Sequence, residues 1–245
     1  MSYNISGGIM KKHKKLLIII SGIVSLLFII FICYFGDYYH AVDIDEYITT
    51  NETVIVKDEK YLTFEPTSEI KGGIIFYPGA KVEYTSYSML MYELSENGYF
   101  CVLVDMPLNF AIFGMNKADD IISRYSDIES WHIMGHSLGG AMASSYAGSN
   151  KDKIDSVILL AAYSTADLDG LNVLSIYGSN DNVLNLDKYK EYLENLPDGY
   201  CEVIIEGGNH AYFGSYGEQK GDGESLIARD EQIGITVKEI IDFLD

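Results

Sequence analysis

The segment around Ser137 places the strongest constraint on the fold. It reads Gly135-His136-Ser137-Leu138-Gly139, with an apolar run before it and a stretch of small residues after it. This order predicts a strand, a sharp turn and a helix, with the serine hydroxyl projecting over the carboxyl end of a sheet. The flanking glycines allow the strand and the helix to pass close to the turn. The segment therefore predicts a nucleophilic serine beside a helix N-terminus, whose N–H groups and dipole would stabilise an oxyanion.

Short β-branched and aromatic runs alternate with helical patterns along the rest of the chain. Strands are predicted at residues 52–57, 61–64, 73–77, 99–105, 131–134, 155–161, 172–177 and 201–205, and helices at 85–97, 117–126, 138–148, 186–196 and 229–243. Several of these strands are apolar on both faces, which is typical of a parallel sheet covered by helices on both sides. The pattern predicts an α/β protein with a doubly wound, mostly parallel sheet.

These features together resemble the α/β-hydrolase fold, over about residues 71–245. More narrowly, the chain resembles the short, cap-less serine esterase and dienelactone-hydrolase-like branch (alpha/beta hydrolase family 5 type). About ten residues separate the strands at 155–161 and 172–177, where many relatives insert a cap domain, so we expect an open cleft. The resemblance implies a nucleophile, an acid and a histidine in that chain order, with no metal and no cofactor.

The chain order selects Asp181 and His210 as partners of Ser137. Asp181 follows the strand at 172–177, and Asp167 and Asp169, after the preceding strand, are its competitors. His210 lies just beyond the last strand, whereas the other histidines lie near the apolar N-terminal segment, in the nucleophile strand or in the turn itself. We expect His210 to accept the Ser137 proton and Asp181 to fix the tautomer of the imidazole.

The expected oxyanion hole consists of two backbone N–H groups. One belongs to Leu138, the residue after the nucleophile, and the other to Ala80, in the loop after the strand at 73–77. Many relatives carry His-Gly where this chain has Pro78-Gly79. The apolar segment 106–113, after another strand, either lines an acyl pocket or packs against the sheet.

Two further features have alternative interpretations. The polar, glycine-rich segment 214–224 resembles a loop that follows the catalytic histidine in the cap-less branch, and we expect it to lie over the active site. Asp222 and Glu224 in this segment match no calcium loop, so a solvated turn is favoured.

Cys101 and Cys201 fall within predicted strands and are expected to be inert buried thiols. A disulfide between them is the alternative if their strands are neighbours.

The N-terminus contains a candidate transmembrane helix at residues 16–35. This uncharged stretch would span about 30 Å as a helix, the thickness of a bilayer core. Lysines at 11, 12, 14 and 15 predict a cytoplasmic N-terminus (residues 1–15), and therefore an extracellular catalytic domain (51–245) on a tether (36–50). The alternative is a cleaved signal peptide that releases a secreted enzyme. The run is longer than such peptides usually have, and bulky residues follow it.

The formal charge of −19 excludes further function classes. Residues 1–40 contain four lysines and one aspartate, so the excess of negative charge lies in the outer domain. Such a domain repels nucleic acids and anionic membrane surfaces. Three cysteines without a Cys-x-x-Cys pair also exclude a zinc finger.

We therefore expect a membrane-anchored serine hydrolase that acts on a small-molecule ester-type acyl substrate through an acyl-enzyme intermediate. The alternatives are an acyltransferase, a thioesterase or amidase with the same triad, and a catalytically idle binding protein.

Overall fold

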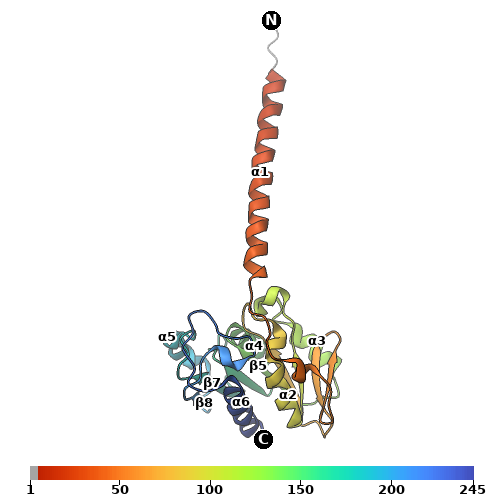
Figure 1. The fold of residues 1–245 in the computed structure, drawn as a ribbon, viewed down its shortest axis with the longest axis vertical. Coiled ribbons are helices and arrows are strands. Elements are labelled where there is room, and N and C mark those ends of the chain that lie inside the picture. Colours follow the sequence, from red (N-terminus) through yellow and green to blue (C-terminus); the bar gives the residue numbers. More distant parts are fainter. Residues whose placement is uncertain (1–4) are drawn as a thin grey trace. The chain divides into compact units, whose positions relative to one another are not determined.

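The computed structural model describes the backbone of residues 5–245 and side chains from residue 17 onward. It separates into two units, residues 1–37 and 38–245. The first unit contains one continuous helix, α1 (Ile5–Gly36) (Figure 1). Within it, Leu17–Gly36 is long and apolar enough to cross a membrane, and none of this stretch is buried inside the protein. Residues 1–4 of the predicted basic N-terminus lie outside the described residues.

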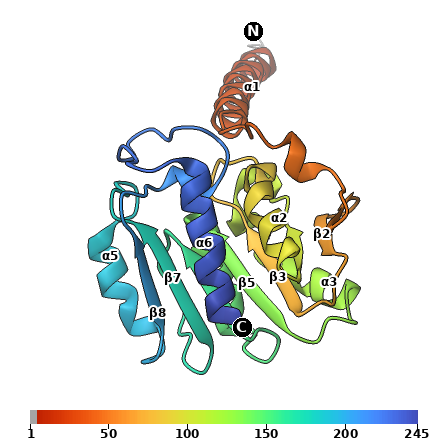
Figure 2. The same ribbon diagram turned by 60° about the horizontal axis from the view of Figure 1, so that its bottom comes forward.

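The second unit is built on one sheet of eight strands (Figure 2). The strands are β1 (Val54–Asp58), β2 (Leu62–Pro66), β3 (Gly72–Tyr77), β4 (Tyr99–Leu103), β5 (Trp131–His136), β6 (Ser156–Leu160), β7 (Asn172–Gly178) and β8 (Cys201–Ile205). Their spatial order is β1-β2-β4-β3-β5-β6-β7-β8. Strands β3 to β8 pair in parallel, and β1 and β2 add an antiparallel edge. The carboxyl ends of the parallel strands therefore meet at one edge of the sheet.

Helices cover both faces of the sheet. The α-helices of this unit are α2 (Ser88–Glu96), α3 (Lys117–Arg124), α4 (Leu138–Ser149), α5 (Leu186–Glu191) and α6 (Arg229–Leu244). Side chains of α2 and α6 pack with one face of the sheet, and those of α3 and α4 with the other. Residues of β3 alternate between the two cores, with Ile74 on one side and Ile75 on the other. This alternation follows from the two-residue period of a strand and explains why both faces of β3 are apolar.

The predicted doubly wound fold without a cap is confirmed. Within the described chain, the connection from β6 to β7 contains no helix. Two predicted helices are each divided into a 3-10 turn and an α-helix. The region 85–97 forms η2 (Tyr84–Tyr87) followed by α2, because Tyr87 has the non-helical angles φ −99° and ψ 11°. The region 186–196 forms α5 followed by η5 (Tyr192–Asn195).

The cysteine prediction was correct for Cys101 and wrong for Cys201. Cys101 is buried in β4, and burial raises the pKa of its thiol well above the ordinary value. Cys201 is exposed, because it begins β8, the last strand at the sheet edge. Four strands separate β4 from β8, so the two thiols are free and cannot form a disulfide with each other.

The segment predicted as a tether is structured. Residues 45–48 form η1 (Asp45–Ile48), and Tyr47 packs against the core that contains α2 and α6. Upstream of this turn, Tyr39 forms a parallel bridge with Val82.

Candidate active site

Ser137 occupies the turn between β5 and α4, as predicted. Its backbone angles are φ 53° and ψ −123°, a conformation that non-glycine residues rarely adopt and that costs of order 1–3 kcal/mol. A hydrogen bond from the Ser137 N–H to the Leu160 carbonyl (2.9 Å) holds the turn against β6. A Cβ atom on Gly135 would meet the backbone of Gly139. The strained geometry is therefore built by the two small residues and a neighbouring strand.

His210 and Asp181 form a buried pair at the same edge of the sheet. His210 Nδ1 lies 2.8 Å from Asp181 Oδ2, and each side chain is 1% exposed. The other carboxylate oxygen of Asp181 accepts N–H groups from Val183 and Leu184, both at 2.8 Å. These bonds fix the orientation of the carboxylate, which in turn favours a proton on Nδ1 of the imidazole. The competing aspartates, Asp167 and Asp169, are exposed, and the Asp167 carboxylate instead accepts the Asp169 N–H (2.8 Å) and lies 3.6 Å from Lys151 Nζ.

The other ring nitrogen of His210, Nε2, is buried and has no hydrogen-bond partner among the described residues. The His210 ring lies 4.5 Å from the ring of His136, the residue directly before Ser137. No hydrogen bond joins Ser137 Oγ to His210 Nε2 within the described chain. The structure thus brings His210 and Asp181 into direct contact and leaves Ser137 unlinked to them. Catalytic hydrogen bonds are often long or misaligned before substrate binds.

A second polar cluster, which sequence reasoning missed, connects the turn to the loop after β3. The hydroxyl of Tyr87 accepts the Gly79 N–H (3.1 Å) and lies 2.8 Å from His136 Nδ1. A phenol has one proton, so the Tyr87 O–H donates to Nδ1 and the His136 proton is assigned to Nε2. Burial holds the pKa of His136 well below its ordinary value, and electrostatic repulsion between the His136 and His210 imidazoles acts in the same direction. Proximity to the His210 backbone opposes these two effects. His136 is therefore neutral at physiological pH.

The two backbone N–H groups expected to form the oxyanion hole are both available among the described residues. Because Tyr87 occupies the Gly79 N–H, the next donor in the loop is the Ala80 N–H, which has no acceptor among residues 5–245. The Leu138 N–H belongs to the first residue of α4 and has no acceptor within the helix. A Cβ atom on Gly139 would collide with the Tyr77 and Pro78 carbonyls, so this glycine allows the loop and the turn to approach closely.

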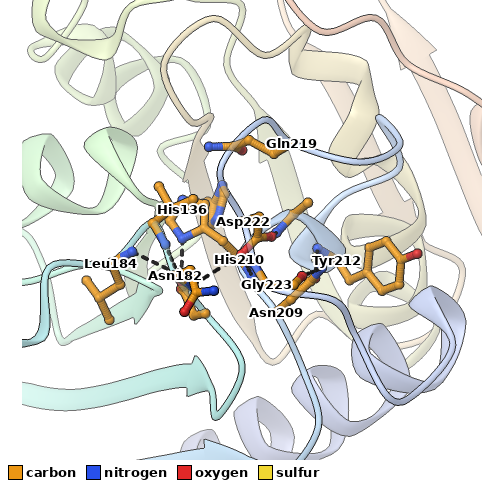
Figure 3. Close-up of polar contacts among 12 residues, drawn as sticks. His136, Asn182, Leu184, Asn209, His210, Tyr212, Gln219, Asp222 and Gly223 are labelled. Atoms are coloured by element: carbon orange, nitrogen blue, oxygen red, sulfur yellow. Dashed lines mark hydrogen bonds and ion pairs between the residues drawn. The ribbon is translucent and has the colours of Figure 1, made fainter.

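The loop after His210 is held by Asp222 (Figure 3). Its carboxylate accepts N–H groups from His210 (3.2 Å), Ala211 (2.8 Å) and Gly223 (2.8 Å). The favoured interpretation of Asp222 as a solvated turn was wrong, because this carboxylate fixes the backbone that carries His210. No sequence motif identified this role, since the partners are backbone groups. Among the described residues, no group of three or more His, Cys, Asp or Glu side chains is arranged to hold a metal ion.

A pocket of about 220 Å³ opens beside Ser137. Its walls are mostly apolar and come from α4, the end of β6 and the loop after Asp181: Ser137, Leu138, Ala141, Ala161, Ala162, Tyr163, Val183, Leu184 and Asn185. The segment 106–113 is not part of this wall. Met106 and Ala111 pack in the core beneath the sheet, whereas Leu108, Ile112 and Phe113 are exposed. The packing interpretation of this segment therefore holds for only two of its residues.

Comparisons with known proteins agree with this architecture. A family model described as the alpha/beta hydrolase family matches residues 73–234. No curated protein matches the sequence. A CIB-like hydrolase from Thermoplasma acidophilum is 20% identical, with a TM-score of 0.55 over 77% of this chain and 99% of the other.

Two lipase structures are similar at the level of the fold. A soluble variant of monoglyceride lipase from Saccharomyces cerevisiae, in complex with a substrate analog, is 12% identical, with a TM-score of 0.59 over 81% of this chain and 96% of the other. The monoacylglycerol lipase of Paleococcus ferrophilus is 14% identical, with a TM-score of 0.59 over 76% and 100%. The family match covers most of the chain, and the fold agrees with it. The chain belongs to the alpha/beta hydrolase family.

Proposed function

We propose that this protein is a membrane-anchored serine hydrolase that cleaves an ester through Ser137, His210 and Asp181. The observation that carries the proposal is the strained Ser137 turn at the sheet edge where the buried His210–Asp181 pair also lies. Strain of this kind persists only where the surrounding structure enforces it, and it exposes the hydroxyl to a substrate. The two lipase neighbours are consistent with an ester as the substrate.

In the proposed reaction, Ser137 Oγ attacks the acyl carbonyl carbon while His210 Nε2 takes the hydroxyl proton. The N–H groups of Leu138 and Ala80 stabilise the negative charge that develops on the carbonyl oxygen. The C–O bond to the alcohol then breaks, and His210 returns the proton to the leaving oxygen. Water, deprotonated by His210, attacks the acyl-enzyme and releases the acid and free Ser137. Asp181 keeps the imidazole in the required tautomer and stabilises its cationic form.

The pocket beside Ser137 favours a short acyl group. A cavity of about 150 Å³ is sufficient for benzene, which has six heavy atoms. The 220 Å³ pocket therefore accommodates an acyl group of up to about nine heavy atoms, a limit that includes the butyryl and hexanoyl groups. Its apolar wall, which includes Ala141, Ala161 and Leu184, suits a hydrocarbon chain better than a charged one.

The membrane anchor is the second part of the proposal. Leu17–Gly36 would span the bilayer, and the lysines before it would keep the N-terminus in the cytoplasm. The catalytic unit would then be extracellular. Mass measurement of the mature N-terminus tests this, because loss of about the first forty residues would identify a signal peptide instead.

The missing hydrogen bond between Ser137 and His210 favours a second candidate, a protein that keeps the fold without catalysis. Hydrolysis of p-nitrophenyl butyrate by the full chain in detergent separates the two. We expect Ser137→Ala to lower kcat at least about a thousandfold. The control Ser149→Ala, at the far end of the same helix, should leave kcat unchanged. Equal rates for wild type and Ser137→Ala would overturn the proposed mechanism and favour the idle fold.

A further inference from the structure

An uncharged surface loop lies beside the point where the chain enters the second unit. Residues 106–116 contain no charged side chain, although the domain around them is strongly acidic. Leu108, Ile112 and Phe113 within this loop are 43%, 57% and 56% exposed. Leu108 and Asn109 both have left-handed backbone angles, with φ of 58° and 57°. We call Leu108, Ile112 and Phe113 the apolar loop.

Backbone hydrogen bonds join the entry point, the candidate oxyanion loop and the apolar loop. The Tyr39 N–H donates to the Lys81 carbonyl (2.7 Å), and the Glu83 N–H donates to the Tyr39 carbonyl (2.9 Å). The Lys81 N–H donates to the Asn109 carbonyl (2.8 Å). Lys81, the residue after Ala80, therefore contacts the segment at Tyr39 through its carbonyl and the apolar loop through its N–H.

The covalent chain limits how far this surface can be from the proposed membrane span. The apolar helix ends at Gly36, and Tyr39 follows three residues later, a reach of about 11 Å when fully extended. Tyr39 binds Lys81, and Lys81 in turn binds Asn109, the residue after Leu108 of the apolar loop. If α1 spans a bilayer, the short connection from Gly36 to Tyr39 therefore limits how far the apolar loop can lie from the membrane surface.

We propose that the apolar loop inserts into the bilayer interface and turns the Ser137 site toward esters of membrane-resident alcohols. This inference rests on the proposed function, because it requires both the anchor and the hydrolase site. An uncharged apolar surface on an acidic domain is suited to contact with a neutral bilayer. The carboxylates on the other surfaces of the domain keep those surfaces in water. Apolar side chains that partition into the acyl boundary stabilise such a contact.

Docking would also determine which part of the ester enters the pocket beside Ser137. The short acyl group would occupy the 220 Å³ pocket, while a long alcohol would remain in the bilayer beside the apolar loop. The inferred substrates are therefore esters with a short acyl part and a lipid-like alcohol part. A soluble ester with the same acyl group would use the same triad without needing the loop.

Fluorescence measures the docking independently of activity. The chain has a single tryptophan, Trp131, which is 3% exposed and gives a constant background. We would introduce Ile112→Trp in the full chain, reconstitute it in phosphatidylcholine vesicles, and add phosphatidylcholine brominated on its acyl chains as a quencher. The matched control is Ile70→Trp, a 40% exposed site just before the amino end of β3, at the opposite edge of the sheet.

Docking predicts that brominated lipid quenches Ile112→Trp and leaves Ile70→Trp at the background level. Equal quenching of the two variants would overturn it. A blue shift of Ile112→Trp without quenching would also overturn it, because a protein surface would then cover the loop.

Activity supplies a second, separable test. The variant with Leu108→Ser, Ile112→Ser and Phe113→Ser should hydrolyse hexadecyl butyrate in vesicles about tenfold more slowly than wild type. Its rate on soluble p-nitrophenyl butyrate should stay within about twofold, which also shows that it is folded. Equal loss on both esters, or no loss on either, would overturn the docking role. A wild type inactive on both esters would refute the proposed function, while the quenching result would still decide the docking.

Discussion

Replacing Tyr87 by phenylalanine tests whether the cluster behind Ser137 positions the candidate oxyanion loop. The substitution keeps the ring but removes the hydroxyl, whose oxygen accepts the Gly79 N–H and whose O–H donates to His136 Nδ1. Both partners are buried, and each buried polar group left unpaired costs about 1–3 kcal/mol. The variant no longer has to desolvate its own hydroxyl, so we expect a net loss of about 2–4 kcal/mol. For a domain of this size this corresponds to a Tm about 5–15 °C lower.

Activity should fall as well, because the Gly79–Ala80 loop loses its attachment to the turn. Complete removal of one oxyanion donor typically costs about 10²–10³ in kcat, so a loosened donor should cost about tenfold. KM should change little, since the acyl pocket is lined by other residues.

The assay compares kcat on p-nitrophenyl butyrate with thermal unfolding, both in detergent and well below the Tm of each variant. Tyr189→Phe is the matched control, because Tyr189 is also buried and its hydroxyl makes two hydrogen bonds, to Ser175 and Glu202, outside the site. The control should lose stability without losing kcat. If Tyr87→Phe keeps kcat within about twofold while its Tm falls, the cluster stabilises the fold but does not position the loop.

Three further variants test other parts of the structure. Burial lowers the pKa of His132 to about 4, against the opposing charge of Asp155, so the unfolded chain binds more protons as pH falls from about 6.5 to about 4. The free energy of unfolding should therefore decrease by about 3 kcal/mol as pH falls through this window. His132→Gln should weaken this pH dependence in urea unfolding, and an unchanged pH dependence would show that His132 is not its cause. Gly139→Ala should lower the free energy of unfolding by about 1–3 kcal/mol and remove most activity, because the new Cβ would collide with carbonyls at the end of β3. The control Gly234→Ala has open space around it and should lose neither stability nor activity in the same assays. Asp222→Ala should lower kcat about tenfold on p-nitrophenyl butyrate by releasing the backbone of His210, and a wild-type kcat would show that the loop holds without it.

The fold was predictable because its signals are local. Strand β8 occupies the predicted residues 201–205, and β3 begins one residue before its predicted start. Apolar runs on both faces identify buried parallel strands, and helical periodicity identifies the helices between them. The break between η2 and α2 was missed: it falls at Tyr87, whose hydroxyl binds His136 and Gly79, and no local pattern indicates such contacts.

The candidate site was predictable only where chain order carries the information. Ser137, Asp181 and His210 each follow a strand, so their common edge follows from a parallel sheet. The roles of Tyr87 and Asp222 depend on backbone N–H groups that become neighbours only after folding. No spacing in the sequence encodes such contacts.

The exposure of Cys201 was missed for a related reason. Its strand resembles an interior strand in composition, but its exposure depends on its place at the edge of the sheet. Sheet order results from pairing between distant segments, and residue composition within one strand does not reveal it.

The central claim is that Ser137 is a nucleophile activated by His210. Reaction of the full chain with a fluorophosphonate, followed by peptide mass mapping, tests it most directly, since such probes label only activated serines. The account predicts one adduct, on the peptide containing Ser137, that disappears in Ser137→Ala, is greatly reduced in His210→Ala and persists in Ser149→Ala. A folded wild type that remains unlabelled, or an adduct on another serine, would contradict it.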